Sequence, residues 1–348
     1  MYIKRLTHQT LLRFKSAFPV VSVTGPRQSG KSTFLQHSLP DYTYVTFDEE
    51  FNIASFESDP KAFLAQYQNR VIFDEVQFVP KLFNMIKVAV DNDRQNYGRY
   101  ILTGSSQFSF LQNVSESLAG RIGLMTQLPL QFSEMPKALL SESIYQGAYP
   151  ELVLRDYREA ELWYASYLDT YLTKDVRTLT QIGDMRDFRQ LIRLLASNVS
   201  QTLDMTSYAS AIGVSVPTIK RWLSVLEASY IVFLLPPYYN NMGKRITKSP
   251  KIYFYDTGLV SYLTGIKNYD LYDKGPMAGA LFENYIVSEI KKMHCHSASH
   301  AELYFLRTQD KAEIDLIVDN KQTRDLIEIK KSSTYMPKFA RHLNAFAK

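Results

Sequence analysis

The spacing of apolar and polar positions predicts an α/β domain at the start of the chain. In residues 1–140, short apolar runs alternate with stretches of helical periodicity, which is typical of a parallel sheet with crossover helices. The predicted strands are Val20–Thr24, Tyr42–Phe47, Arg70–Phe73, Tyr100–Thr103 and Gly123–Leu128. Helices are predicted to begin near Lys31, Pro60 and Leu82.

The remaining residues predict two further regions after a break at Gly147–Pro150. Large apolar side chains at helical spacing indicate helices over 151–201, and residues 278–348 predict a helix, three strands and a helix. We therefore expect three domains, at 1–150, 151–270 and 271–348. The final helix begins at Met336 and the sequence stops soon afterwards. The third domain is thus expected to be truncated or minimal, with an exposed sheet edge that could recruit a partner strand.

Composition and charge narrow the class of protein. Of 348 residues, 45% are hydrophobic and 22% charged, which is an ordinary globular balance. The formal net charge of +5 permits a nucleic-acid partner without requiring one. Cys295 is the single cysteine, so a disulfide framework is excluded, and His294–His296 is expected to be a polar loop rather than a zinc site. The longest apolar run, Tyr230–Tyr239, is too short for a membrane helix. We expect a cytoplasmic protein with no membrane partner.

A phosphate-binding loop follows the first predicted strand. The segment Gly25–Ser32 matches G-x-x-x-x-G-K-[ST] in the strand–loop–helix context that this pattern requires. Backbone N–H groups and the helix N-terminus surround the phosphates in such loops. Lys31 is expected to reach the β- and γ-phosphates, and Ser32 to bind magnesium. We therefore predict that ATP and Mg²⁺ are bound by Gly25, Pro26, Arg27, Gln28, Ser29, Gly30, Lys31, Ser32 and Thr33.

A second motif, Val71–Glu75, is an apolar strand that ends in two carboxylates. Asp74 is expected to hold Mg²⁺ through water, and Glu75 to act as the general base on the attacking water. The alternative is an ordinary surface Asp-Glu pair at the end of a strand. Enough residues separate the two motifs in the sequence for a strand and helices to lie between them. Both motifs can therefore meet at one edge of the sheet.

Other polar residues are candidate sensors of the γ-phosphate. Tyr100–Ser106 predicts a strand that ends in small polar residues, of which Ser105 is the first candidate and Thr103 the second. The alternative is a simple turn. Arg121 is a candidate cation for the γ-phosphate, within its own chain or from a neighbouring subunit of a homo-oligomer. A salt-bridged or solvated arginine is the alternative there.

Residues 206–228 are typical of a helix–turn–helix. Gly213 permits the turn, Ser215 can cap the second helix, and the two strands that follow could form a wing. Between positions 205 and 251, Glu227 is the single acidic residue. The basic residues there are Lys220, Arg221, Lys244, Arg245, Lys248 and Lys251. We therefore predict DNA as a partner through Lys220, Arg221, Lys244 and Arg245, with a packing or lid domain as the alternative.

Carboxylates and a lysine alternate with apolar residues near the end of the chain, in Glu313–Asp319 and Leu326–Lys330. Strand periodicity places Glu328 and Lys330 on one face, where Asp315 and the helix residue Glu283 could join them. Asp315 and Glu328 would bind Mg²⁺, and Lys330 would orient the nucleophile. This is the D…E-x-K arrangement of restriction-endonuclease-like nucleases. The alternative is an exposed strand face with alternating charges.

The combined motifs resemble prokaryotic AAA-type ATPases that carry a C-terminal domain of unknown function. Beyond the nucleotide motifs, the likeness rests on Asp74–Gln77 with Pro80, Leu102–Ser106, Ala119–Arg121, Gly147–Glu151, Tyr171–Leu172 with Asp175, Tyr255–Leu259 and Phe282–Asn284. It covers essentially the whole chain. The resemblance implies a P-loop AAA-like α/β core, a winged-helix segment and a small, nuclease-like α+β domain.

Two functions fit these residues. The first is a magnesium-dependent ATPase coupled to DNA binding, with DNA cleavage as a further activity. The second is a nucleotide-switched interaction module with a degenerate nuclease-like domain that binds a protein partner at its sheet edge. A small-molecule kinase also needs a phosphate-binding loop, but the strand end at Asp74-Glu75, the sensor strand and the winged helix argue against it.

Overall fold

The computed structural model describes residues 2–104, 117–171, 185–238, 249–308 and 312–346. Ser105, Asp175, Lys244 and Arg245 lie outside these residues. The chain divides into two compact units. The first is Met1–Leu130 with Cys295–Ala298, and the second is Gln131–His294 with Ser299–Lys348. No helix in the described ranges is long and apolar enough to cross a membrane.

The first unit is built on a five-stranded parallel sheet, which confirms the predicted α/β core. Its strands are β1 (Val20–Thr24), β2 (Thr43–Thr46), β3 (Val71–Asp74), β4 (Tyr100–Gly104) and β5 (Ile122–Thr126). They lie in the order β2-β3-β4-β1-β5, and every neighbouring pair is parallel. Since β1 is flanked by β4 and β5, the loop that follows it leaves the interior of the sheet at its carboxyl edge.

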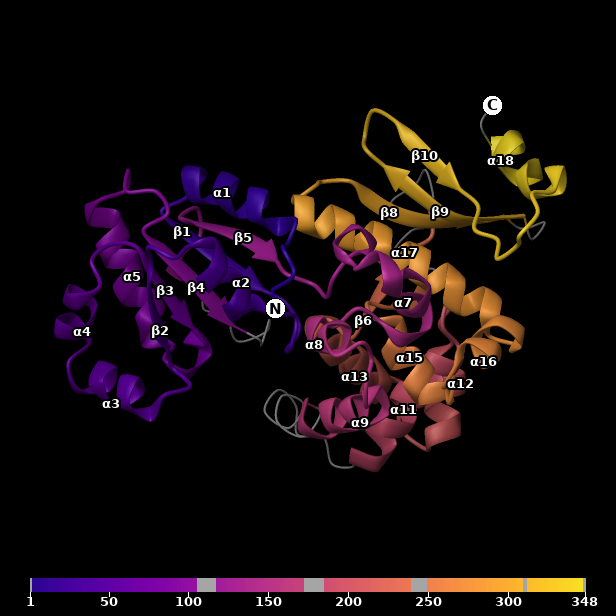
Figure 1. The fold of residues 1–348 in the computed structure, drawn as a ribbon, viewed down its shortest axis with the longest axis horizontal. Helices are drawn as coiled ribbons and strands as arrows, with labels where there is room; N and C mark the ends of the chain where they lie inside the picture. Colours follow the sequence, from indigo (N-terminus) through magenta and orange to yellow (C-terminus); the bar gives the residue numbers. More distant parts are fainter. Residues whose placement is uncertain (1, 105–116, 172–184, 239–248, 309–311, 347–348) are drawn as a thin grey trace. The chain divides into compact units, whose positions relative to one another are not determined.

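Helices cover both faces of this sheet (Figure 1). On one face, α1 (Thr7–Ala17) and α2 (Lys31–Ser38) pack Leu11 and Phe34 against Val21, Ile72 and Ile101. The other face is covered by α3 (Glu50–Ser58), α4 (Pro60–Gln66) and α5 (Lys81–Asn92). Burying each large apolar side chain contributes about 1.5–3 kcal/mol, so the two layers fix the sheet that carries the loop.

The second unit is largely helical. Its described helices are α7 (Leu140–Gln146), α8 (Pro150–Leu154), α9 (Ala160–Tyr171), α11 (Met185–Ser197), α12 (Met205–Ile212), α13 (Val216–Ala228), α15 (Thr257–Thr264), α16 (Tyr269–Lys274) and α18 (Arg341–Phe346). It also contains α17 (Ala278–Ser297) as far as His294, and the last residues of that helix belong to the first unit. The predicted turn between α12 and α13 is present, with Gly213 in the left-handed region at φ +84°. Ser215 caps α13 by accepting a hydrogen bond from the Thr218 N–H.

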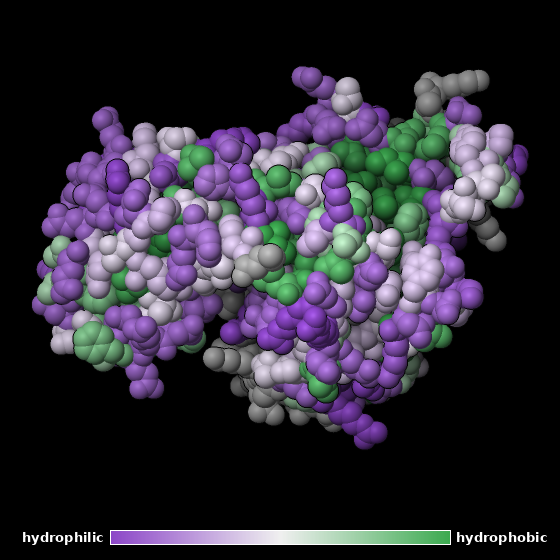
Figure 2. All heavy atoms as spheres, in the orientation of Figure 1, coloured by the Kyte–Doolittle hydropathy of each residue, from purple (hydrophilic) through white to green (hydrophobic). Residues whose placement is uncertain are grey.

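Two antiparallel sheets complete this unit. β6 (Val232–Leu235) pairs with β7 (Lys251–Phe254), and residues 239–248 between them lie outside the description. The second sheet has the order β10-β9-β8, from β8 (Glu302–Arg307), β9 (Glu313–Asp319) and β10 (Arg324–Ile327). Figure 2 shows hydrophobic side chains gathered over this small sheet. β10 ends at Ile327, so Glu328–Lys330 follow the strand rather than belonging to it, which corrects the predicted range.

Candidate functional site

The loop between β1 and α2 places two glycines at a positive φ, which glycine adopts readily. Gly25 lies at φ +145° and Gly30 at φ +82°. A Cβ atom on Gly25 would lie 2.1 Å from the carbonyl oxygen of Gln127, so a larger residue would displace the chain there. Left-handed turns of this kind turn successive backbone N–H groups toward one point and form an anion-binding concavity. The backbone of the loop is therefore compatible with the predicted binding of phosphates.

The ammonium of Lys31 is held over this loop. Lys31 is 6% exposed, and its Nζ donates hydrogen bonds to the carbonyl oxygens of Gly25 at 3.1 Å and Pro26 at 2.9 Å. Ser29 is fully buried, and its hydroxyl also donates to the carbonyl of Pro26. The positive charge is thus held against the backbone of the predicted phosphate-binding loop.

Asp74, the last residue of β3, is the centre of a hydrogen-bond network at the carboxyl edge of the sheet. The Ser32 hydroxyl donates to its Oδ2 at 2.7 Å, and the Tyr44 hydroxyl donates to the same oxygen. Its Oδ1 accepts from the Thr103 hydroxyl and from the Glu75 N–H. The network joins the phosphate-binding loop, the carboxylate strand and the sensor strand, as their parallel arrangement predicts.

The oxygen donors of this network fit a magnesium ion. Ser32 and Asp74 supply a hydroxyl and a carboxylate in contact with each other, and Mg²⁺ prefers such ligands beside substrate phosphates. Burial raises the pKa of Tyr44, and the hydrogen bond to Asp74 raises it further. Tyr44 therefore keeps its proton and remains a donor to Asp74.

The remaining predicted ATPase residues are placed differently. Glu75 follows β3 directly in a left-handed conformation, and the Gln77 amide donates to its carboxylate. Arg121 precedes β5 at the amino edge of the sheet, opposite the loop, and makes bidentate contacts of 2.8 and 2.9 Å with Asp91. Arg121 thus matches the salt-bridged alternative in its own chain. A role toward a neighbouring subunit stays a prediction.

Sequence reasoning missed a buried arginine beneath the loop. Arg5 is 4% exposed, and it donates to the carbonyl of Ser29 at 3.0 Å. Its other nitrogen donates to the carbonyls of Leu128 at 2.7 Å and Pro129 at 3.3 Å. One guanidinium therefore fastens the phosphate-binding loop to the segment that leaves β5. A lone basic residue near the N-terminus carries no periodic signal, so no pattern could have found it.

Replacing Arg5 by Met is expected to lower the free energy of unfolding by about 2–3 kcal/mol, because buried carbonyls lose a charged donor. ATP affinity should fall as well, since the Ser29 carbonyl is released. Chemical denaturation and binding of a fluorescent ATP analogue measure the two effects. Arg13→Met is the matched control, because Arg13 is exposed in the same segment. Equal unfolding midpoints for the two variants would contradict the role of Arg5.

The stretch predicted as a polar loop around Cys295 is the last turn of α17. His296 is 3% exposed, and its Nε2 accepts a hydrogen bond from the Leu128 N–H at 3.0 Å. The Thr10 hydroxyl donates to the His296 carbonyl at 2.6 Å. The helix continues because no proline or glycine interrupts it, and the histidine has a structural role within the first unit.

In the second unit, the segments Gly147–Glu151 and Tyr255–Leu259 form one junction around a buried carboxylate. Asp256 accepts hydrogen bonds from the Ala148 N–H and the Tyr164 hydroxyl, both at 2.7 Å, and from the Leu259 N–H at 3.0 Å. A Cβ atom on Gly258 would lie 2.2 Å from the Tyr164 hydroxyl. Burial raises the pKa of Asp256, and the charge of Lys292 opposes that rise. These motif residues hold the unit together.

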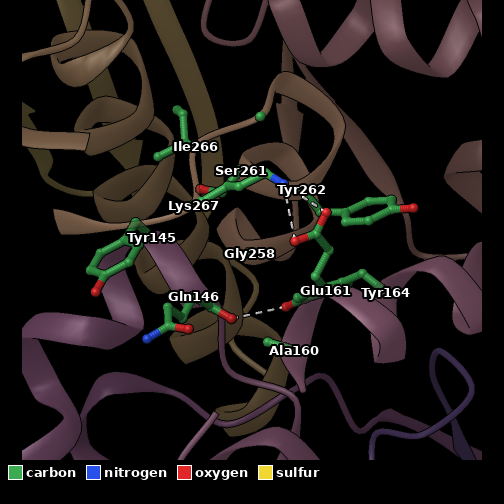
Figure 3. A pocket seen from close by; sticks show the side chains of 11 residues that line it. Tyr145, Gln146, Ala160, Glu161, Tyr164, Gly258, Ser261, Tyr262, Ile266 and Lys267 are labelled. Carbon is green, nitrogen blue, oxygen red and sulfur yellow. Dashed lines mark hydrogen bonds and ion pairs between the residues drawn. The ribbon is translucent and has the colours of Figure 1, made fainter. Parts of the chain in front are cut away.

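A cavity beside this junction is too small for a nucleotide. Its volume is about 90 Å³, and Figure 3 shows Tyr145, Tyr164 and Ser261 among its lining residues. Glu161 and Lys267 form an ion pair of 2.9 Å at this cavity. Ligand sites usually have volumes of about 300–1,000 Å³, so this space suits a few water molecules.

The structure brings together three of the four predicted C-terminal residues, namely Asp315, Glu328 and Lys330. The Nζ of Lys330 lies 3.2 Å from Asp315 Oδ2 and 2.7 Å from Glu328 Oε1. Glu283 instead accepts from Lys251 at 3.0 Å and from the Tyr253 hydroxyl at 2.6 Å. Within the described ranges, no three acidic, histidine or cysteine side chains are grouped to hold a metal ion. The binding of Mg²⁺ by Asp315 and Glu328, which both contact Lys330, therefore stays a prediction.

The six basic residues counted between positions 205 and 251, four of which were predicted to contact DNA, divide into three groups. Lys220 and Arg221 are exposed on α13, whose opposite face buries Ile219, Trp222 and Leu226. Lys244, Arg245 and Lys248 lie outside the described residues. Lys251 was counted in the basic excess, but it is 4% exposed and forms ion pairs with Glu283 and Glu313. Its charge is therefore not available to a phosphate backbone.

Three family models match consecutive parts of the chain. Residues 17–136 match an AAA domain, 137–270 a domain of unknown function (DUF8612), and 278–348 another domain of unknown function (DUF4143). Uncharacterized proteins of Mycobacterium tuberculosis and Mycobacterium bovis are each 30% identical over 318 residues, covering 91% of this chain and 71% of theirs. An uncharacterized protein of Haemophilus influenzae is 25% identical over 297 residues, covering 74% of this chain and 72% of its own.

A solved structure shares the fold. The Walker-type ATPase of Pyrococcus abyssi superposes with a TM-score of 0.50 at 14% identity, covering 76% of this chain and 96% of its own. The AAA match covers the parallel sheet and the phosphate-binding loop, and this match agrees with an ATP-binding ATPase core. By its likeness to the mycobacterial proteins, the chain belongs to their family, the prokaryotic AAA-type ATPases with a C-terminal domain of unknown function.

Proposed function

We propose that the protein hydrolyses ATP with Mg²⁺ and couples this reaction to DNA binding. The network around Asp74 carries the proposal for hydrolysis. It joins Ser32 of the phosphate-binding loop, Thr103 of the sensor strand and the N–H of Glu75 on one carboxylate. A surface Asp-Glu pair at a strand end would not gather these groups.

The roles of the residues follow from their positions. Lys31 and the backbone of the loop hold the β- and γ-phosphates, and Ser32 with Asp74 holds Mg²⁺, which when bound neutralises charge on the phosphate oxygens. Glu75 accepts a proton from the attacking water. Thr103 donates to Asp74 and fixes the orientation of its carboxylate. Ser105 stays the first candidate for contact with the γ-phosphate.

ATP turnover by the wild-type protein tests the hydrolase directly. We expect phosphate release that requires Mg²⁺, measured with and without duplex DNA. Chelation of the metal should abolish it. The absence of turnover even with DNA present would overturn the hydrolase, and ATP binding without turnover would favour the nucleotide-switched interaction module.

DNA binding is supported by the exposed basic positions of α13. Lys220 and Arg221 lie next to each other on a helix whose buried face includes Trp222, so the helix is fixed while both cations face solvent. Cations presented in this way suit the phosphates of a duplex, whose binding is strongly salt-dependent. Lys244 and Arg245 are proposed to add contacts from the segment between β6 and β7.

Reversing both charges, Lys220→Glu with Arg221→Glu, is expected to weaken duplex binding and to lower the slope of affinity against salt by about 2, roughly one per lost phosphate contact. A salt titration with and without ATP measures both quantities. Lys61→Glu with Lys81→Glu is the matched control, since both lysines are exposed in the first unit. Failure of the wild type to bind a duplex at low salt would overturn DNA binding.

For the C-terminal region, we propose a restriction-endonuclease-like domain that is degenerate. The ion pairs of Lys330 with Asp315 and Glu328 support the likeness to the D…E-x-K arrangement. Lys251 engages Glu283, the predicted fourth member of that arrangement, and this favours degeneracy. We expect no magnesium-dependent cleavage of DNA by the wild type. If the wild type cleaves DNA and both Asp315→Ala and Lys330→Ala do not, the domain is an active nuclease and the proposed degeneracy is wrong.

A further inference from the structure

The hydroxyl of Tyr44 reaches Asp74 from a strand that carries none of the nucleotide-binding motifs. Tyr44 lies on β2, which is at one edge of the parallel sheet beside β3 (Figure 1). The register of the two strands pairs Tyr44 with Ile72 and Thr46 with Asp74. Side chains alternate along a strand, so Tyr44 and Asp74 project from the same face of the sheet. The Tyr44 hydroxyl donates to Asp74 Oδ2, and β2 thereby contributes a donor to the candidate site.

Apolar packing holds the ring of Tyr44 and thereby fixes the position of its hydroxyl. The residue is half-buried, and it packs against the buried cluster that includes Phe34 of α2 and Ile72 of β3. A tyrosine has only two side-chain torsions, so a packed ring leaves little freedom to the hydroxyl at its end. The hydrogen bond to Asp74 is therefore held at a low cost in conformational entropy.

Four donors share the two carboxylate oxygens of Asp74. Its Oδ1 accepts from the Thr103 hydroxyl and the Glu75 N–H. Its Oδ2 accepts from the hydroxyls of Ser32 and Tyr44. Asp74 is 3% exposed, and an ionised carboxylate has about four acceptor positions, so these donors fill the places that water would take at the surface. The orientation of the carboxylate is therefore fixed from both of its oxygens.

The two donors to Oδ2 have different roles in the function proposed above, on which this inference rests. Ser32 is a ligand of Mg²⁺ there, whereas Tyr44 belongs neither to the phosphate-binding loop nor to the metal ligands. We propose that Tyr44 is a positioning residue for Mg²⁺, whose hydroxyl keeps the Asp74 carboxylate in one orientation while Ser32 binds the metal. Hydrogen-bond partners of metal-binding groups orient those groups, and losing such a partner lowers metal affinity by about 10–100-fold.

Binding of a non-hydrolysable ATP analogue to the full-length protein tests this proposal. Its affinity is measured in excess Mg²⁺ and in EDTA, and the ratio of the two affinities reports how strongly the metal and the nucleotide support each other. We expect this ratio to be about tenfold smaller in Tyr44→Phe than in the wild type. The affinity in EDTA should stay unchanged, because the variant keeps the packed ring and leaves the loop intact. Circular dichroism verifies that the variant is folded.

Tyr42→Phe is the matched control for the loss of a tyrosine hydroxyl. Tyr42 packs against the same apolar cluster, but its hydroxyl donates to the Gly98 carbonyl at 2.7 Å. It should keep the wild-type ratio. In an Asp74→Asn background, Tyr44→Phe should lower the ratio no further, because Tyr44 acts through that carboxylate.

Three results would overturn the proposal. The first is a ratio in Tyr44→Phe that equals or exceeds the wild-type ratio. The second is an equal decrease in Tyr42→Phe, and the third is a further decrease when Tyr44→Phe is added to Asp74→Asn. Failure of the proposed function is distinguishable from these results, because the wild type itself would then bind the analogue no better in Mg²⁺ than in EDTA. That result would overturn both proposals together.

Discussion

Replacing Glu75 by Gln is expected to lower ATP turnover by about 10²–10⁴-fold, which is the usual contribution of a positioned general base. The amide has nearly the same size but cannot take a proton from water. ATP binding should survive, because Lys31 is held over the loop by the carbonyls of Gly25 and Pro26 and does not depend on Glu75. Release of labelled phosphate and equilibrium binding of ATP measure the two quantities separately.

The control for this variant is Glu50→Gln, which removes an exposed carboxylate at the start of α3. It should leave turnover unchanged. The variant Lys31→Ala should lose ATP binding together with turnover. Comparing it with Glu75→Gln separates a defect in ATP binding from a defect in the hydrolysis step. Turnover at the wild-type rate by Glu75→Gln would show that another group accepts the proton.

Replacing Asp256 by Ala is expected to lower the free energy of unfolding by about 3–5 kcal/mol. The Ala148 and Leu259 N–H groups and the Tyr164 hydroxyl would all lose their buried acceptor. Chemical denaturation followed by circular dichroism measures the change. The effect should fall on the second unit, which contains every partner of this carboxylate.

Two further variants test whether the loss of stability comes from the buried hydrogen bonds of Asp256. Tyr164→Phe removes one of the donors to Asp256 and should cost about 1 kcal/mol. Asp270→Ala removes a carboxylate that is 77% exposed on α16 and should change the free energy of unfolding by less than about 0.5 kcal/mol. A loss for Asp256→Ala no larger than that for Asp270→Ala would mean that water replaces the carboxylate as the acceptor.

Local patterns predicted the elements of the first unit because each has its own signal. β1 spans Val20–Thr24 as expected, and α2 begins at Lys31, since an apolar run and a glycine-rich turn mark both boundaries. The meeting of Ser32 and Asp74 also followed from sequence, because the carboxyl ends of parallel strands share one edge. These inferences needed only spacing along the chain.

Contacts between distant segments could not be predicted in this way. Lys251 looked like one more basic residue of a wing, but Glu283 and Glu313 bury its charge. Local charge does not reveal such burial, because the partners come from other elements. Arg5 was missed for the same reason, since its acceptors include Ser29 and Leu128. The partner of Arg121 lies on α5, thirty positions away.

The contact between His296 and Leu128 has a consequence for synthesis on the ribosome. The two residues are 168 positions apart, and both belong to the unit that carries the phosphate-binding loop. Chains generally begin to fold from the N-terminus while they are being translated. The parallel sheet can therefore form early, but the Leu128 N–H and the Thr10 hydroxyl must rely on water until the end of α17 has been made. The ATPase unit is completed only after most of the second unit has been translated.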